Sequence, residues 1–107
     1  MLTDEQLEQL YYSKESGIHG EGLFSRVKFI ADDYMGEYDG PDVVDNGPHV
    51  LWTEDEDDVW IARDGKNLLR YLNHSKNPHA EFRGFELFAL REILPNEEIT
   101  IDYGEEP

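Results

Sequence analysis

Apolar residues in this chain occur in short runs, and turn-forming residues close each run. Val50–Trp52 and Val59–Ile61 flank an acidic stretch, while Ala80–Phe82 and Phe85–Leu90 flank the pair Arg83–Gly84. Short apolar segments bounded by turn signals are typical of β-strands. We therefore expect a mainly β fold with little helix.

One short helix is expected near the start of the chain. Thr3 can cap this helix, Gln6 follows three residues later, and Leu7 and Leu10 give it an apolar face. The other segments with a clear pattern are Tyr11–Ser13, Phe24–Ile30 and Ile99–Ile101, expected as strands, and Asn67–Leu72, expected as a helical turn.

At 107 residues the chain is expected to form one domain, residues 1–107. A chain of this length buries about 60–70% of its unfolded surface, which is enough for one core. It has no cysteine, so disulfides, cysteine-ligated zinc and a cysteine nucleophile are excluded. No apolar run has membrane-spanning length, and Met1–Glu5 is acidic where a secretory signal is basic. We expect an intracellular, cytoplasmic protein without membrane contact, or a nuclear one in a eukaryotic or viral source.

Acidic residues outnumber basic ones by 25 to 9, which gives a net charge of −16. Such a charge repels phosphate backbones, so direct nucleic-acid binding is not expected. It attracts basic polypeptides and raises their rate of association. A strongly acidic surface can also simply keep a protein soluble or reflect adaptation to a salty cytoplasm. Charge alone does not decide between these interpretations and attraction of a basic partner.

The densest charge is the run of five acids at Glu54–Asp58. This run lacks the central glycine and the distal glutamate of a calcium-binding EF-hand loop, so no metal site is expected. Like charges at this density are typical of a solvated hairpin tip.

Two further segments are too polar or too rich in glycine for plain strands. The Gly-x-Gly at Gly20–Gly22 would suit a dinucleotide-binding loop only between a strand and a helix, and here a strand is expected after it. A Rossmann domain is therefore rejected, and an ordinary glycine turn stays as the alternative. The run Asn73–Pro78 can likewise be a turn, in which Asn and Ser bond their own backbone.

Taken together, four segments resemble the signature motifs of the SET-domain protein lysine methyltransferases. The resemblance extends from about Lys14 to Gly104, nearly the whole chain. The four segments are Gly20–Phe24 (Gly-Glu-Gly-Leu-Phe), Glu37–Gly40 (Glu-Tyr-Asp-Gly), Asn73–Ser75 (Asn-His-Ser) and Asp102–Gly104 (Asp-Tyr-Gly).

The resemblance implies a SET-domain fold, with several short twisted sheets and a C-terminal pseudoknot in which the tail threads beneath a loop. Residues 1–13 would be a helical and extended lead-in, and residues 41–66 a variable insert beside the peptide groove. The chain resembles minimal members of the family, which lack flanking zinc clusters.

The resemblance also implies S-adenosylmethionine as the cofactor. In the family, a glycine loop cradles the methionine end of this molecule with its backbone. The residues implied to bind the cofactor are Gly20, Glu21, Gly22, Asn73 and His74, together with Arg70, whose position contacts cofactor in some relatives.

A channel for the substrate lysine is implied as well. Tyr103 corresponds to the family's catalytic tyrosine, and Tyr38 is expected to line the channel and take part in catalysis. A lysine amine has a pKa near 10.4 in water, so an apolar channel must favour its neutral form. Because a phenol has a pKa near 10, Tyr103 is expected to orient the amine rather than remove its proton. Ile101 stands where the family usually has Phe or Tyr, which implies room for di- or trimethylation.

The function implied is S-adenosylmethionine-dependent N-methylation of lysine in a basic protein substrate. The alternative is a SET-fold binding module that has lost turnover and holds a basic partner on its acidic surface. An acidic inhibitor or nucleic-acid mimic would explain the charge but none of the motifs. Only three residues follow Gly104, so we expect a second subunit, in a homodimer, or the substrate itself to complete the channel wall.

Overall fold

The computed structural model describes residues 2–54 and 56–102. This part of the chain contains the α-helix α1 (Asp4–Leu10) and the 3-10 helix η1 (Leu68–Tyr71), and otherwise strands and loops, which confirms the mainly β fold. The strands are β1 (Tyr11–Glu15), β2 (Glu21–Ser25), β3 (Tyr34–Glu37), β4 (Asp42–Val43), β5 (Val50–Glu54), β6 (Trp60–Asp64), β7 (Asn73–His74), β8 (Ala80–Arg83), β9 (Glu86–Ala89) and β10 (Glu98–Ile101).

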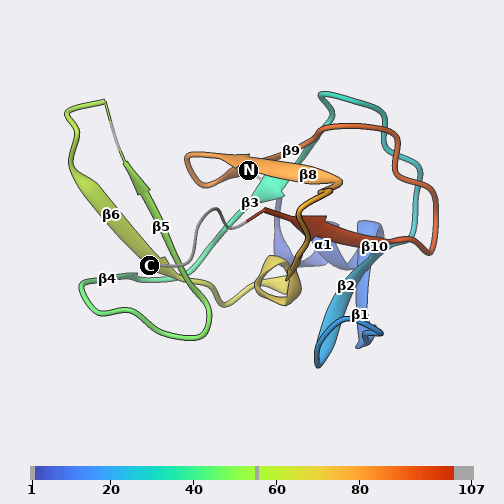
Figure 1. Ribbon diagram of the computed structural model, residues 1–107, viewed down its shortest axis with the longest axis horizontal. Helices are drawn as coiled ribbons and strands as arrows, with labels where there is room; N and C mark the ends of the chain where they lie inside the picture. Colours follow the sequence, from blue (N-terminus) through green and yellow to red (C-terminus); the bar gives the residue numbers. More distant parts are fainter. Residues whose placement is uncertain (1, 55, 103–107) are drawn as a thin grey trace.

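The larger sheet has seven strands and is organised around β10. Its order is β1-β2-β10-β8-β9-β3, and β7 also pairs with β10. The last strand is antiparallel to β2 and parallel to both β7 and β8, and it runs between β2 and β8 in Figure 1. The loop between β7 and β8 also bonds to this strand, because Ser75 and His79 donate their backbone N–H groups to the carbonyl oxygens of Ile101 and Thr100. The C-terminal strand is therefore enclosed by segments that precede it by many residues.

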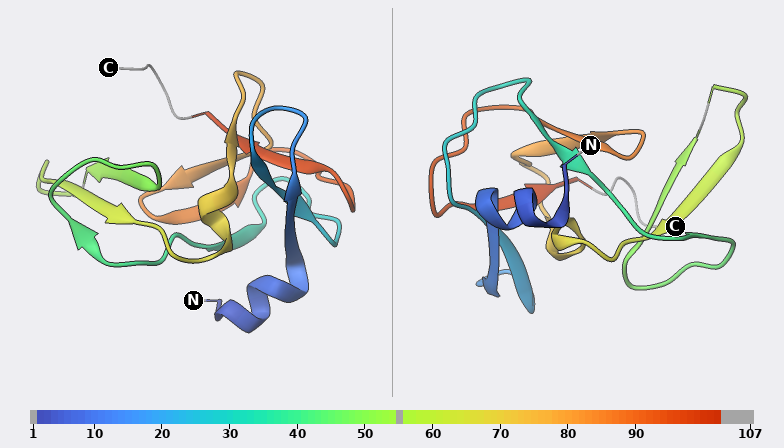
Figure 2. Two further views of the ribbon diagram at one scale, coloured as in Figure 1. Left: turned by 90° about the horizontal axis from the view of Figure 1, so that it is seen from below. Right: turned by 180° about the vertical axis from the view of Figure 1, so that it is seen from behind.

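The expected insert, residues 41–66, forms a second sheet of three strands in the order β4-β6-β5. This sheet extends away from the larger one, and both views of Figure 2 show it on one side of the molecule. Its edge strand β5 pairs with β6 from Val50↔Asp64 to Glu54↔Trp60. The chain therefore carries a hairpin that projects from the main sheet.

The core lies between the larger sheet and the two helices. Tyr11 is fully buried there, its ring stacks on Phe29 with centroids 5.7 Å apart, and its hydroxyl donates to the Met35 carbonyl oxygen at 2.6 Å. Burial raises the pKa of the Tyr11 hydroxyl, so it stays protonated and keeps this bond. The other apolar core side chains are Leu7, Leu23, Phe29, Met35, Tyr38, Leu69, Leu72, Ala80, Leu87, Ala89, Ile93, Ile99 and Ile101.

Two local predictions are confirmed, a helix cap and a hairpin turn. Thr3 and Gln6 form a reciprocal capping box at the start of α1. Gly84 has φ +65° in the turn between β8 and β9, a conformation that favours glycine.

The strand expected over residues 24–30 is shorter than predicted. It ends at Ser25, whose hydroxyl donates to the Val27 carbonyl at 2.5 Å and accepts from the Val27 N–H at 3.2 Å. Hydrogen bonds between a serine side chain and the backbone two residues away compete with the backbone pairing of a strand. Beyond it only Phe29 pairs, in an isolated bridge with Ile93.

Within residues 2–54 and 56–102, no helix combines the length and the apolar character that crossing a bilayer requires.

Gly40 joins the two sheets, and we predict that it tolerates no side chain. Its φ is +156°, and a Cβ there would collide with the Asp64 carbonyl. Gly40→Ala should therefore lower the free energy of unfolding by about 3 kcal/mol or more, measured by denaturant titration. Gly17→Ala is the matched control, because a Cβ at Gly17 meets no atom within 4 Å, and it should change stability by less than about 0.5 kcal/mol. Equal stability of the two variants would contradict the close approach at Gly40.

Candidate functional site

The glycine-rich loop before β2 is closed by its own hydrogen bonds. The Ser16 N–H donates to the Gly20 carbonyl at 2.7 Å, and the Ile18 N–H donates to the Ser16 hydroxyl at 2.9 Å. Gly20 has φ +46°, and a Cβ at this position would meet no atom within 4 Å. The loop thus presents bare backbone at Gly20 to open space.

Gly22 serves a different purpose, because it makes room for Glu98. A Cβ at Gly22 would collide with the Glu98 carboxylate. That carboxylate accepts hydrogen bonds from the Ser16 hydroxyl at 2.7 and 2.8 Å and from the Asn73 side-chain amide at 2.9 Å. Glu98 therefore ties the glycine loop and β7 to the last strand.

The Asn73 side chain completes this connection. Its Nδ2 also donates to the carbonyl oxygens of His19, at 3.0 Å, and Glu21, at 3.4 Å. The amide nitrogen is thus directed at the glycine loop and at Glu98. These bonds fix the orientation of the whole amide group beside the loop.

A cavity of about 750 Å³, here called the loop cavity, opens beside these residues. Its volume lies in the range of small-molecule binding sites. Five of the six residues predicted to bind cofactor line it, and the sixth, Gly22, does not line it and is packed against Glu98. The residues lining the loop cavity are Ile18, His19, Gly20, Glu21, Pro48, His49, Arg70, Tyr71, Leu72, Asn73 and His74.

Arg70 is a fixed cation on the wall of the loop cavity. Its guanidinium donates to the carbonyl oxygens of Lys66 and Asn67, at 2.8 and 2.9 Å, and to the Tyr71 hydroxyl at 2.6 Å. It also lies 4.3 Å from the centroid of the Tyr71 ring. The guanidinium is thus held in place by the helical turn η1 that precedes β7.

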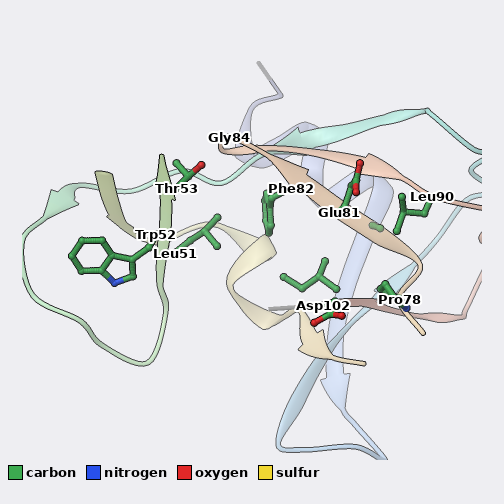
Figure 3. A pocket seen from close by; sticks show the side chains of 11 residues that line it. Leu51, Trp52, Thr53, Pro78, Glu81, Phe82, Gly84, Leu90 and Asp102 are labelled. Carbon is green, nitrogen blue, oxygen red and sulfur yellow. The ribbon is translucent and has the colours of Figure 1, made fainter. Parts of the chain in front are cut away.

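A second hollow, here called the strand groove, lies between the two sheets and has a volume of about 460 Å³. Leu51 and Thr53 of β5 border one side of it, and Glu81 and Phe82 of β8 border the other (Figure 3). Ile101 and Asp102, at the end of β10, line the same groove. Because β5 is an edge strand, one wall of the groove is an open sheet edge.

A small cavity of about 20 Å³, here called the passage, lies between the loop cavity and the strand groove. It shares Pro48, His49 and Arg70 with the loop cavity, and Leu51 and Phe82 with the strand groove. The loop cavity and the strand groove therefore lie on either side of this small cavity.

Tyr38 lines the passage and is almost fully buried, with 6% of its surface exposed. Its hydroxyl donates to the His49 carbonyl at 2.5 Å. Its ring meets Phe82 edge-on, with centroids 5.5 Å apart, and packs so closely on Gly65 that a Cβ there would overlap it. The ring and the hydroxyl of Tyr38 are thus both held in position.

Two other predicted channel residues have different outcomes. Ile101 is 2% exposed and reaches the strand groove from β10, but it does not line the passage itself. Tyr103 lies outside the described residues, so its predicted role in catalysis stays a prediction.

Sequence reasoning missed Glu98, Ser16 and His49. The alternation in Glu98–Ile101 carries a signal for Glu98, because Ile99 and Ile101 enter the core and Glu98 must face the other way. His49 had no local signal, since it contributes a backbone carbonyl from a loop whose position depends on the second sheet.

His79 fastens the loop after β7 to the last strand. Its Nδ1 lies 3.0 Å from the Thr100 hydroxyl, and its Nε2 lies 3.9 Å from a Glu97 carboxylate oxygen. Burial and the nearby Arg91 lower the pKa of His79, which outweighs the opposite influence of Glu97 and Glu98. His79 is therefore neutral in the folded protein at neutral pH.

This shift predicts a pH dependence of stability. The unfolded chain takes up a proton at His79 near its ordinary pKa of 6.5, whereas the folded chain does so only at lower pH. The stabilisation from the neutral ring is complete above about pH 6.5 and is lost as the pH falls toward the folded pKa, by at most about 1.4 kcal/mol per unit. Denaturant titrations from pH 7.5 to about 5.5 should show a smaller loss for His79→Gln than for the wild type. His19→Gln, at an exposed histidine, is the control, and a wild-type slope in His79→Gln would refute the prediction.

Comparison with known proteins identifies similar sequences. The SET domain family matches residues 20–104. Histone-lysine N-methyltransferase ATX2 of Arabidopsis thaliana is 30% identical over 95% of this chain and 11% of its own length. Histone H3-lysine(4) N-trimethyltransferase ATX1 of the same plant is 32% identical over 95% of this chain and 12% of its own length. Histone-lysine N-methyltransferase 2B of Homo sapiens is 31% identical over 82% of this chain and 4% of its own length. The chain thus spans no more than 12% of the length of these relatives.

Proposed function

This chain belongs to the SET-domain family, and we propose that it methylates lysine side chains of basic proteins with S-adenosylmethionine as the methyl donor. The observation that supports this most directly is the passage at Tyr38 between the loop cavity and the strand groove. A small donor in the loop cavity and a lysine reaching in from a polypeptide in the strand groove would meet at this point. Holding two reactants in line can supply roughly 7–11 kcal/mol of the barrier.

The residues around the loop cavity suit a donor of this kind. Gly20 offers exposed backbone, and the amide of Asn73 is held in a fixed orientation by Glu98 and His19. Arg70 offers a fixed positive charge that can meet a carboxylate. When bound, S-adenosylmethionine supplies a methyl group activated by a sulfonium. Glu21 and His74 complete the set of residues proposed to hold it, and Gly22 acts by admitting Glu98.

The passage provides surroundings in which a lysine amine would lose its proton. Tyr38, Leu51 and Phe82 supply aromatic and apolar surface there. Such surroundings disfavour the charged ammonium and so lower the pKa of a lysine that enters them. The Tyr38 hydroxyl bonds to the His49 carbonyl, so its oxygen stays available as an acceptor for an N–H group. We assign to Tyr103 the role of orienting the amine toward the methyl group.

The strand groove suits an extended basic peptide. The free edge of β5 offers backbone groups that can pair with an added strand. Carboxylates of Glu81 and Asp102 lie along the groove, and the net charge of −16 attracts basic chains. We therefore propose a lysine-containing segment with further basic residues as the substrate.

One observation favours the alternative of a binding module without turnover. The passage measures only about 20 Å³, which is room for about one water molecule. A lysine side chain needs the walls at Tyr38 and Phe82 to move apart. A protein that binds basic partners without methylating them would need no such motion.

A transfer assay separates the two functions. The protein is incubated with S-adenosylmethionine labelled in the methyl group and with a mixture of basic proteins, and label in protein is counted. We expect labelling by the wild type and a loss of about 10²-fold in Tyr103→Phe, with cofactor affinity by calorimetry retained. Tyr34→Phe is the control, because Tyr34 is exposed and lies away from both cavities, and it should label as the wild type does. Cofactor binding without any labelling would support the binding module instead.

Ile101 gives a prediction about the product. Its side chain carries no hydroxyl and reaches the strand groove beside the passage. Ile101→Tyr would add a hydroxyl able to hold water in the space that further methyl groups need. We expect mass spectra of a substrate peptide to show di- and trimethyllysine with the wild type and mainly monomethyllysine with Ile101→Tyr. Ile101→Leu should keep the wild-type product, and the same product pattern in all three proteins would contradict a role for this position.

A further inference from the structure

The two tryptophans of the chain lie on the same face of the projecting hairpin. In the register of β5 and β6, Trp52 lies opposite Ala62, and Glu54 lies opposite Trp60. Residues directly opposite or two apart share a face of a sheet. Trp52, Glu54 and Trp60 therefore form one surface, here called the outer face.

Two of the three outer-face residues, Glu54 and Trp60, line none of the cavities of the proposed active site. Leu51 and Thr53 alternate with the outer-face residues on β5 and line the strand groove, and Trp52 also borders this groove. Figure 3 shows Trp52 and Leu51 projecting from opposite sides of the strand. Arg63 also belongs to the inner side, because it lies 4.0 Å from the Phe85 ring centroid of the main sheet. The methylation proposal assigns no role to the side chains of Trp52, Glu54 and Trp60.

The outer face exposes an unusual amount of aromatic surface. Trp52 is 40% exposed and Trp60 is 60% exposed. The indole N–H of Trp52 donates to Asn46 at 3.3 Å, and Asn46 also borders a surface hollow of about 460 Å³. Val44, which is 87% exposed, lines the same hollow. Contiguous exposed apolar surface of this kind marks interaction sites in soluble proteins.

Carboxylates among these aromatic groups indicate what binds there. Glu54 lies directly across from Trp60, and Asp45 lines the adjoining hollow. Indole rings attract cations, arginine above all, over their faces. Nucleic acids, anionic lipids and a second copy of this chain, itself at −16, would all be repelled. A basic segment satisfies both the rings and the carboxylates.

We infer that the outer face binds an arginine- and lysine-rich segment of a protein partner, at a site that adjoins the strand groove at Trp52 and extends away from it over Glu54 and Trp60. Guanidinium groups stack on Trp52 and Trp60, and Glu54 receives their N–H groups. The inference stands apart from the methylation proposal, since this binding requires neither cofactor nor passage. Where the partner is also the substrate, this second contact raises the local concentration of its target lysine.

Tryptophan fluorescence reports on the outer face, because both tryptophans of the chain, Trp52 and Trp60, lie on it. Trp52 also borders the strand groove, so the variants below decide which of the two sites the peptide occupies. The probe is an alternating arginine–glycine peptide without lysine, added without cofactor. We expect the peptide to shift or quench the emission with saturation, and to bind more weakly as salt increases. An alternating glutamate–glycine peptide should leave the emission unchanged. Because the probe contains no methyl acceptor, its behaviour does not bear on methyl transfer.

Variants locate the site, with affinity measured by calorimetry. Trp60→Leu should weaken peptide binding by about fivefold or more, and Glu54→Gln by about threefold at low salt. Glu5→Gln on α1 removes the same charge elsewhere and should bind as the wild type does. Glu81→Gln removes it from the strand groove, whose own affinity for basic peptides it would lower, and should weaken binding of this probe less than Glu54→Gln does. Far-ultraviolet circular dichroism of Trp60→Leu checks that the hairpin still folds.

Three results would overturn the inference. The first is an unchanged tryptophan emission at saturating peptide. The second is an equal loss of affinity in Glu54→Gln and Glu5→Gln, which would mean that the net charge of the protein alone attracts the peptide. The third is a loss confined to Glu81→Gln, which would place the peptide in the strand groove.

Discussion

The pairing of β10 with distant segments is the constraint on which the rest of the structure depends. This strand bonds to β2 on one side and to β7 and β8 on the other. Glu98 at its start adds a carboxylate that receives Ser16 and Asn73. Hydrogen bonds to charged groups contribute about 1.5–3 kcal/mol each. The glycine loop and the Asn-His-Ser segment are therefore held together only once β10 has paired with its neighbours. The loop cavity between them forms only when this pairing is complete.

A second set of contacts fixes the insert against this sheet. The Arg63 guanidinium donates to the Tyr38 carbonyl at 3.0 Å and lies over the Phe85 ring. The Asp39 carbonyl accepts the Lys66 N–H at 2.8 Å beside Gly40. Because the passage is bordered by Tyr38 and Phe82 from one sheet and Leu51 from the other, these contacts set its width. The insert thus forms one wall of the passage and of the strand groove.

The sequence predicted the features that short segments determine. The capping box at Thr3, the turn at Gly84 and the positions of the hairpins follow from local propensities and turn chemistry. The motif resemblance predicted six residues as cofactor ligands; five of them line the loop cavity, and their binding of cofactor stays a prediction. The early end of β2 was not predicted, because it depends on the hydrogen bond from the Ser25 hydroxyl to the Val27 carbonyl. The short strand β4 was not predicted, because Asp42–Val43 pairs with β6, which lies far along the chain. The contacts of Glu98 and the His49 carbonyl depend on tertiary packing and have no counterpart in any single stretch of sequence.

The close packing of Tyr38 on Gly65 has a consequence for how the passage can evolve. Gly65 does not border the passage, yet a side chain at this position would overlap the Tyr38 ring. Even one added methyl group at Gly65 would force that ring to move. The position of the aromatic wall of the passage therefore depends on a residue that lies outside it.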